Sequence, residues 1–448
     1  MMKKDAFIFD RYTFKKETGT LHLHYSFEDG PFFEEKIIFA NVTRTLSEKD
    51  ECALDNAFRL LFLLAGVSYY KAYVPAKLIC RAFSLDKQTA AFAEKVYRNG
   101  LGEFAYRNKL DLKPLVNFVS SDAVAPRAEK LDLPHHLLIP VGGGKDSIVT
   151  IETLKPVEKN ITLFALGGAS GMAQPIADTV EKAGLPYIFV TRTLSPELIE
   201  LNKQGALNGH IPITAILSAI TVCCAILYGY DTIVLSNEHS ASAPNLRIDD
   251  LEINHQYSKS FSFETDLSDY IAVHISPDIN YFSLLRPLSE AAILQRFAKM
   301  DKYHAIFRSC NTAFKQDVST RNKNWCCDCP KCRFVFMGLA PFMKKDALVS
   351  IFGKDMLNDP TQYDGFAELC GVAAYKPFEC VGEIEESALL MAQLSQSPEW
   401  QKDYVVAAMG PKLFEQAHDF DAEYEELFEL HPDHRVPENY AGLLDDSA

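Results

Sequence analysis

A run of glycines followed by charged and hydroxyl residues is the strongest chemical signal in the sequence. Residues 137–155 read LLIPVGGGKDSIVTIETLK: an apolar run, then Gly142, Gly143 and Gly144, then Lys145-Asp146-Ser147 and a helical pattern. Glycines let backbone N–H groups approach an oxyanion closely, and the positive end of a following helix adds to the attraction. The stretch predicts a loop that holds phosphate groups; a structural glycine-rich turn is the alternative.

Details of this loop separate it from the two commonest nucleotide-binding loops. A Walker A loop needs glycine at the position of Ile139 and Ser or Thr at the position of Asp146. A dinucleotide-binding loop would place the charges of Lys145 and Asp146 beside a pyrophosphate. The stretch instead resembles the loop of the PP-loop ATPases, Ser-Gly-Gly-x-Asp-Ser, with Gly142 in place of the first serine. That resemblance implies cleavage of ATP between the α and β phosphates, a loop that holds the departing pyrophosphate, and Lys145 and Asp146 as catalytic residues, with Asp146 placing Mg²⁺.

Four cysteines have the spacing of metal ligands. Cys326, Cys329 and Cys332 stand three residues apart in WCCDCPKC, and Cys310 lies upstream. Four thiolates suit tetrahedral Zn²⁺ and leave no open coordination position, so the ion would be structural. The 7-cyano-7-deazaguanine synthases, relatives within the PP-loop family, carry a similar cysteine pattern, and this resemblance supports a metal site. Cys327 would be a spare or a substitute ligand; the alternative is that all these thiols are merely buried or partly exposed.

Further candidates follow predicted strands, where ligands of open parallel sheets bind. The predicted nucleotide-binding residues are Gly142, Gly143, Gly144, Asp146 and Ser147 of the loop, together with Gly167, Gly168, Arg192, Gly209, His210 and Asn237. Residues 254–264, NHQYSKSFSFE, predict a substrate loop that acts through His255, Tyr257 and Lys259, with a plain polar surface loop as an equal alternative. Cys380 lies near a predicted helix start, where the pKa of a thiol is often lowered, so it is a candidate acid or base; a core cysteine is the alternative.

Positioning these residues requires a parallel sheet. From residue 137, the short apolar runs LLIPV, ITLFALGG, PYIFVTR, TIVLS and YFSLLRP alternate with helical patterns, which indicates βαβ units. The predicted fold class is α/β, with a doubly wound parallel sheet of the PP-loop (HUP-like) type. Residues 6–40 hold three aromatic-rich runs separated by glycine turns and predict an antiparallel meander.

We therefore predict three regions. Residues 1–130 form a β-meander and helical domain for substrate recognition, residues 131–333 form the PP-loop domain with the cysteine cluster, and residues 334–448 form a mainly helical region.

Composition excludes some classes of function. Lys and Arg number 45 against 60 Asp and Glu, a net charge of −15, which argues against a groove for a nucleic-acid backbone. The N-terminus MMKKDAFIFD lacks the apolar segment of a secretory signal. Residues 213–230 are about long enough to span a membrane, but a buried helix is the better interpretation. Clustered cysteines suit metal binding better than disulfides, so we expect a cytoplasmic protein without membrane or nucleic-acid partners.

The whole chain, including the meander, the NHQYSKS stretch and WCCDCPKCRFVFMGLAPF, resembles an epimerase branch of the PP-loop family. This resemblance implies ATP-dependent inversion of the terminal L-glutamate of UDP-MurNAc-L-Ala-L-Glu through an acyl-adenylate. AMP and diphosphate would be released, and the product would be a D-glutamate precursor of peptidoglycan. ATP and Mg²⁺ would be required, with a structural Zn²⁺ in the cysteine cluster. Two alternatives remain: another adenylating PP-loop enzyme that forms a nitrile or amide, or a catalytically inactive nucleotide-binding module.

Overall fold

The computed structural model describes residues 4–248, 251–314, 320–322, 324–373 and 377–445. Within them, ten strands form one sheet in the order β12-β9-β6-β7-β8-β3-β2-β1-β4-β5. The strands of this sheet are β1 Ala6–Lys15, β2 Thr20–Phe27, β3 Phe32–Phe39, β4 Lys77–Cys80, β5 Phe118–Val119, β6 Leu137–Pro140, β7 Ile161–Gly167, β8 Tyr187–Thr193, β9 Thr232–Leu235 and β12 Asn280–Ser283. A separate two-stranded hairpin pairs β10 Leu246–Ile248 with β11 Leu251–Ile253.

Five strands make the parallel half of the sheet that the sequence predicts. β12, β9, β6, β7 and β8 are all parallel neighbours. The chain begins this half in its middle, at β6, proceeds outward to β7 and β8, and then returns to the other side of β6 for β9 and β12. Strand order therefore reverses between β6 and β9, which is where ligands bind in sheets of this kind. The α/β class is confirmed.

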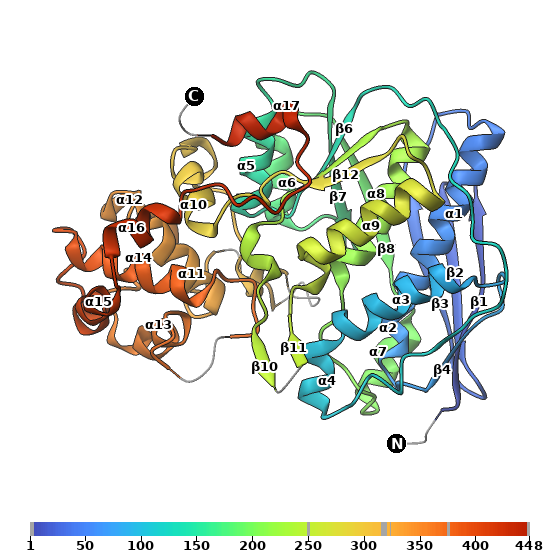
Figure 1. The fold of residues 1–448 in the computed structure, drawn as a ribbon, viewed down its shortest axis with the longest axis horizontal. Coiled ribbons are helices and arrows are strands. Elements are labelled where there is room, and N and C mark those ends of the chain that lie inside the picture. Colours follow the sequence, from blue (N-terminus) through green and yellow to red (C-terminus); the bar gives the residue numbers. More distant parts are fainter. Residues whose placement is uncertain (1–3, 249–250, 315–319, 323, 374–376, 446–448) are drawn as a thin grey trace.

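The predicted meander is also confirmed, but it does not stand apart. β1, β2 and β3 pair in antiparallel register, and β3 pairs with β8 from Lys36 opposite Thr193 to Phe39 opposite Val190. The meander thus extends the parallel half, as Figure 1 shows at the blue end of the chain. The sheet runs unbroken across the boundary that the sequence suggests near residue 130.

Helices lie on both faces of the parallel half of the sheet and on one face of the meander. The helices before the C-terminal region are α1 Glu48–Ala65, α2 Val67–Tyr70, α3 Lys87–Gly100, α4 Gly102–Asn108, α5 Lys145–Leu154, α6 Gln174–Ala183, α7 Pro196–Lys203, α8 Ile213–Tyr228, α9 Phe261–His274 and α10 Glu290–Ala298. The helices of the C-terminal region are α11 Pro330–Leu339, α12 Lys345–Phe352, α13 Tyr363–Leu369, α14 Ile384–Gln396, α15 Tyr404–Gln416, α16 Phe420–Glu426 and α17 Glu438–Ala441. The predicted helical character beyond residue 334 is therefore confirmed.

Alternation along the central strands divides the core into two clusters. In β6, Leu138 faces a cluster built with α1, α3 and α8, whereas Leu137 and Ile139 face one built with α5, α6, α10 and the C-terminal helices. A period of two is what a strand buried on both faces produces. The sheet is therefore sandwiched between helices over its parallel half, while Figure 1 shows the meander with helices on one side.

Two apolar helical segments lie in this core. α8, within the segment that is about long enough to span a membrane, is buried along most of its length and ends at Gly229, whose φ is +81°. The stretch Glu48–Tyr70, α1 with α2, is long and apolar enough to cross a membrane, but 83% of its apolar window is buried inside the protein. Both therefore have the burial of core helices, as predicted for residues 213–230.

Candidate functional site

The glycine loop connects β6 to α5 in a conformation that needs glycine at its centre. Gly143 has a φ of +77°, and a Cβ there would lie 2.7 Å from the backbone carbon of Pro175. At Gly142, a Cβ would meet no atom within 4 Å, so that side of the loop is open. Gly144 is the residue before α5, which begins at Lys145. The loop thus places unobstructed backbone beside a helix N-terminus, the arrangement that binds anions.

A cavity of about 330 Å³ opens at this loop. Its wall includes Gly142, Gly144, Asp146, Ser147 and Asn237, all predicted nucleotide-binding residues. Asn237 follows β9, so the cavity lies between the ends of β6 and β9, at the reversal of strand order. The structure therefore brings together the loop and the neighbouring strand end that the sequence predicts. Lys259, predicted for the substrate, and Lys331, which was not predicted, add two ammonium groups to the wall.

Lys145 is buried and is not part of the wall of this cavity. Its buried ammonium forms ion pairs with Asp146 and with Glu290 of α10. Burial lowers the pKa of Lys145, but the two carboxylates outweigh burial and raise it, so the side chain is charged. Burial raises the pKa of Glu290. The position of Lys145 suits fixing the Asp146 carboxylate better than contacting a phosphate.

A second group of polar side chains gathers around Cys380. The Cys380 thiol lies 3.6 Å from Nζ of Lys259, and it also interacts with His255, which is hydrogen-bonded to Glu103 of α4. Lys259 ends the short 3-10 helix η2 Tyr257–Lys259. Because Lys259 also lines the glycine-loop cavity, the thiol and the cavity share one ammonium group.

These contacts change the acidity of both partners. Burial raises the pKa of the Cys380 thiol, but Lys259 and the hydrogen bond from His255 outweigh burial and lower it to about 7. Burial lowers the pKa of His255, but its hydrogen bonds to Cys380 and Glu103 outweigh burial and raise it to about 9. Near neutral pH, a thiolate therefore faces an imidazolium. Such a pair is typical of reactive cysteines, so the prediction of Cys380 as an acid or base gains a geometric basis.

Gly209 and His210 lie with this second group rather than at the glycine loop. The ring of His210 is 4.1 Å from that of His255, centroid to centroid, and its Nδ1 lies 4.0 Å from Glu103. Burial and the neighbouring His255 lower the pKa of His210 to about 4, so this imidazole is neutral. The carbonyl of Gly209 accepts a hydrogen bond from Lys71. Neither residue is part of the cavity wall where the nucleotide was predicted.

Other predicted residues also lie elsewhere. The guanidinium of Arg192 is buried and pairs with Glu35 at 2.7 Å, with a further bond to Ser68, so it joins the meander to β8 instead of facing the loop. Tyr257 is buried in the core against Phe263. Gly167 and Gly168 end β7 in a tight turn, and a Cβ on Gly167 would lie 2.6 Å from the carbonyl oxygen of Gly171. The packing of this turn explains Gly167 without a ligand, whereas a Cβ on Gly168 would meet only the carbonyl oxygen of Arg192, at 3.9 Å.

The four predicted metal ligands do converge. The Sγ atoms of Cys310, Cys326, Cys329 and Cys332 all lie within 4.8 Å of one another, and the separations from Cys332 to Cys326 and Cys329 are 3.6 and 3.4 Å. Zn–S bonds of about 2.3 Å in a tetrahedron place sulfur atoms roughly 3.8 Å apart, so the donor set fits Zn²⁺. Cys327 is not part of the group, since its thiol contacts the carbonyl of Phe352 at 3.3 Å.

The cysteine group is adjacent to the glycine loop. Arg308 donates a backbone hydrogen bond to Gly143 at 2.9 Å, two residues before Cys310. Lys331, between Cys329 and Cys332, lines the cavity. An ion held by the four thiols would therefore fix two parts of the cavity wall.

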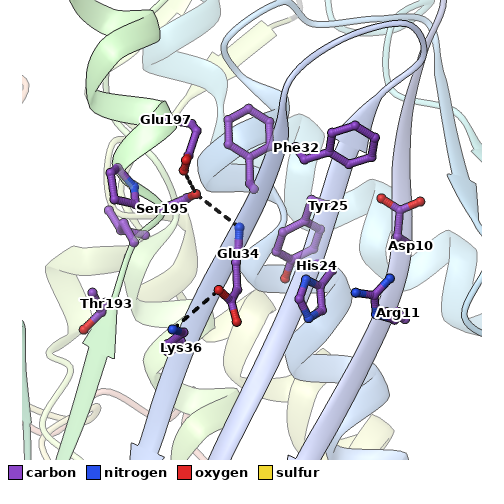
Figure 2. Close-up of a pocket in the computed structure, with 13 residues that line it drawn as sticks. Asp10, Arg11, His24, Tyr25, Phe32, Glu34, Lys36, Thr193, Ser195 and Glu197 are labelled. Carbon is purple, nitrogen blue, oxygen red and sulfur yellow. Dashed lines mark hydrogen bonds and ion pairs between the residues drawn. The ribbon is translucent and has the colours of Figure 1, made fainter.

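A larger cavity, of about 740 Å³, lies on the outer face of the meander (Figure 2). Its charged residues are of both signs: Glu34 pairs with Lys36 of the wall at 3.5 Å and with His22, outside the wall, at 2.7 Å. In Figure 2, the hydroxyl of Ser195 accepts a hydrogen bond from the backbone N–H of Glu34 and donates one to the carboxylate of Glu197. This surface has no anion-binding loop and no activated nucleophile, so the chemistry points to the smaller cavity.

Fold and site together define an α/β protein with a glycine loop at the switch point of its sheet and, beside it, a thiol whose pKa is lowered to about 7. Two family models match the chain: the MurL N-terminal domain over residues 1–284 and the MurL C-terminal domain over residues 306–424. The chain belongs to the MurL family.

Relatives match along nearly the whole length. A UDP-N-acetyl-alpha-D-muramoyl-L-alanyl-L-glutamate epimerase of Xanthomonas oryzae pv. oryzae is 43% identical over 96% of this chain and 95% of its own. Epimerases of the same name are 40% identical in Micromonospora sp., over 99% of this chain and 98% of the relative, and in Salinispora tropica, over 91% and 89%. The resemblance to an epimerase branch is therefore supported.

Proposed function

We propose that this chain inverts the terminal L-glutamate of UDP-MurNAc-L-Ala-L-Glu in an ATP-dependent reaction that proceeds through an acyl-adenylate. The carboxylate next to the α-carbon attacks the α-phosphorus of ATP, and pyrophosphate leaves. A base then removes the α-proton, a second group protonated from solvent returns a proton to the opposite face, and water hydrolyses the adenylate to AMP and the D-glutamate product. The observation that carries the proposal is the activated thiol of Cys380, placed 3.6 Å from the Lys259 ammonium that also lines the glycine-loop cavity.

Activation is needed because the α-proton beside a free carboxylate is only weakly acidic. A carbanion there would develop next to a full negative charge. An acyl-adenylate removes that charge and supplies an electron-withdrawing carbonyl. A positioned base with a pKa near neutrality then abstracts the proton efficiently. The Cys380 thiol, with a pKa of about 7, has that property.

The site divides these tasks among its parts. Backbone N–H groups of residues 142–144 and the start of α5 would hold the departing pyrophosphate. Lys259 and Lys331 would neutralise the α-phosphate and the carboxylate that attacks it. The Cys380 thiolate would take the α-proton on one face of the glutamate. His255 and Glu103 would hold the thiolate in its charged form.

Two metals fit the residues present. Asp146 lines the cavity beside the loop, where its carboxylate would hold Mg²⁺ and so neutralise the pyrophosphate. Cys310, Cys326, Cys329 and Cys332 would hold a structural Zn²⁺. Neither metal would take part in the proton transfer, which we assign to the Cys380 thiol.

Solvent isotope labelling tests the proposal. In D₂O with UDP-MurNAc-L-Ala-L-Glu, ATP and Mg²⁺, deuterium should appear at the glutamate Cα of a product with D configuration, and AMP rather than ADP should accumulate. Neither label nor inversion should appear without ATP. Cys380→Ala should retain pyrophosphate release while losing deuterium incorporation, and Cys52→Ala, at an exposed thiol on α1, should behave like the unmodified protein.

Two other outcomes correspond to the alternative functions. AMP formation with unchanged configuration and no deuterium would indicate an adenylating enzyme of another kind, such as one that forms an amide or nitrile. Binding of ATP without pyrophosphate release, for every tested substrate, would indicate a nucleotide-binding module. Either result would overturn the epimerase proposal.

A further inference from the structure

A cavity of about 570 Å³ lies beside α4, away from the glycine loop. It is bounded by α4, the turn after it and Ile253 of β11, whose Cγ2 lies 3.5 Å from the Cβ position of Gly102. Figure 1 shows α4 next to the β10–β11 hairpin, between the sheet and the C-terminal helices. The volume is within the range of small-molecule sites, roughly 300–1,000 Å³.

The walls of this cavity combine an apolar surface with cationic side chains. Tyr106, which is 44% exposed, Leu110 and Ile253 offer aromatic and aliphatic faces. Lys109 and Lys113 are exposed at the rim, and the described part of the structure gives neither ammonium an ion-pair partner. An apolar face with two unpaired ammonium groups beside it suits a flat base joined to a diphosphate.

The charge of the chain gives further support for an anion at this place. The chain as a whole is acidic, with 45 Lys and Arg against 60 Asp and Glu. The two exposed lysines at this rim, Lys109 and Lys113, therefore contrast with the charge of the chain. Lys109 ends α4 with a φ of +55°, the left-handed conformation that is common at helix C-termini. Asp111 is the acidic residue of the wall, and its carboxylate accepts a hydrogen bond from the backbone N–H of Lys113.

A second cavity links this one to the thiol. About 410 Å³ in volume, it is lined by Tyr106, Arg107, Phe378 and Glu379, so Tyr106 belongs to both cavities. Glu379 is the neighbour of Cys380 in the chain. Arg107 is bonded at 2.5 Å to Glu103, the carboxylate that holds His255 beside the thiol. Tyr106 and Arg107 of α4 therefore connect the surroundings of Cys380 with the cavity at Lys109.

We propose that the cavity at Tyr106, Lys109 and Lys113 binds the nucleoside diphosphate end of the substrate. With its glutamate at Cys380, the substrate would run past Phe378 and Arg107 and place its uracil against Tyr106 and Ile253. Its two phosphates would meet Lys109 and Lys113. The assignment rests on the proposed function, since it supplies the end of the substrate that the glycine-loop cavity does not hold.

Binding of UDP alone tests this subsite without turnover. Isothermal titration of the full chain with UDP should show one site, and Lys109→Ala with Lys113→Ala should weaken it about 100-fold, because each charge-assisted contact contributes about tenfold. Tyr106→Ala should weaken both UDP and uridine. The matched control, Lys16→Ala with Lys87→Ala, removes two exposed lysines elsewhere and should leave UDP affinity unchanged.

Several results would overturn the subsite. These are equal loss in the control pair, unchanged UDP affinity in the Lys109 and Lys113 variant, and displacement of UDP by ATP, which would place it at the glycine loop. In turnover, the variant should raise KM for the UDP-linked substrate with kcat unchanged, and a substrate truncated to MurNAc-L-Ala-L-Glu should be insensitive to it. UDP binding as expected without any epimerisation would reject the proposed function and keep the subsite.

Discussion

Replacing Lys259 by methionine should make the Cys380 thiol markedly less acidic. The ammonium of Lys259 is the largest of the influences that lower the pKa of this thiol, which burial alone would raise. Methionine keeps an unbranched chain of similar length but removes the charge. The pKa of Cys380 should therefore move up from about 7 toward the value of an ordinary cysteine.

The size of the effect follows from the thiolate population. With a pKa of about 7, roughly half of the thiol is ionised at pH 7. A pKa near 9 would leave about 1%, a decrease of about 50-fold. His255 remains hydrogen-bonded to the thiol in the variant, so we expect a decrease between about 5-fold and 50-fold in the rate of alkylation at pH 7.

Iodoacetamide labelling measures this directly. The rate at Cys380 is followed by peptide mass spectrometry from pH 5 to pH 10, with exposed Cys52 in the same sample as the internal reference. Lys259→Arg should retain most of the low pKa because it retains the charge. Glu103→Gln should raise the pKa of Cys380 to a smaller extent, because it weakens the imidazolium that faces the thiol.

The sign of the activity profile follows from the same pair. The thiolate forms as pH rises through about 7, and the His255 imidazolium that stabilises it is lost as pH rises through about 9. kcat/KM should therefore rise as pH passes about 7, and above about 9 the thiol stays ionised without the imidazolium. If Lys259→Met labels at Cys380 with the same midpoint as the unmodified protein, the electrostatic account of this thiol is wrong.

Two further predictions concern the glycine loop and the cysteine cluster. Asp146→Ala should abolish pyrophosphate release, because Asp146 lines the cavity, and the variant should stay folded, because Glu290 still pairs with the buried Lys145 ammonium; near-normal release in a folded variant, measured by a coupled pyrophosphate assay, would remove the loop from the mechanism. Elemental analysis should find about one zinc per chain, lost in Cys329→Ser with Cys332→Ser and kept in Cys327→Ser, whose thiol lies outside the cluster. Zinc retained in the double variant would reject the ligand set.

Local features of the sequence were predictable because local physics fixes them. The glycine loop follows a strand and precedes a helix, and only glycine accommodates the φ and the close approach at Gly143. The period-two alternation of β6 and the turn glycines of the meander likewise report structure within a few residues. The spacing in WCCDCPKC places three thiols near one another in any compact turn, so the cysteine cluster could also be predicted from the sequence.

Contacts between distant segments were not predictable from one sequence. Glu103 stands in GLGEFAYRN without any motif, and its partner His255 is 152 residues away. Arg192 follows a strand in the way a ligand-binding residue does, but its guanidinium pairs with Glu35, 157 residues away. Lys145 looks like the lysine of a phosphate loop, and only the tertiary structure shows Glu290 opposite it.

The junction between the meander and the parallel strands has a consequence for the chemistry. Arg192 and Glu35 form a buried ion pair across the β3–β8 junction, and Tyr69 of α2 donates to the same carboxylate at 2.9 Å. Removing one partner of such a pair costs several kcal/mol, because the remaining charge is left buried. This network therefore fixes the N-terminal helices to the sheet that carries the glycine loop.

That fixation matters because the acid–base group is assembled from distant parts of the chain. Glu103 comes from α4, Lys259 and His255 from the segment after β11, and Cys380 from the C-terminal region. Catalytic positioning tolerates errors of only about 1 Å before rates fall about a hundredfold. A meander that continues the sheet, rather than hanging from a linker, holds α4 in a fixed position relative to the glycine loop. The ten-stranded sheet is thus a physical reason why the two halves of the site can act on one substrate.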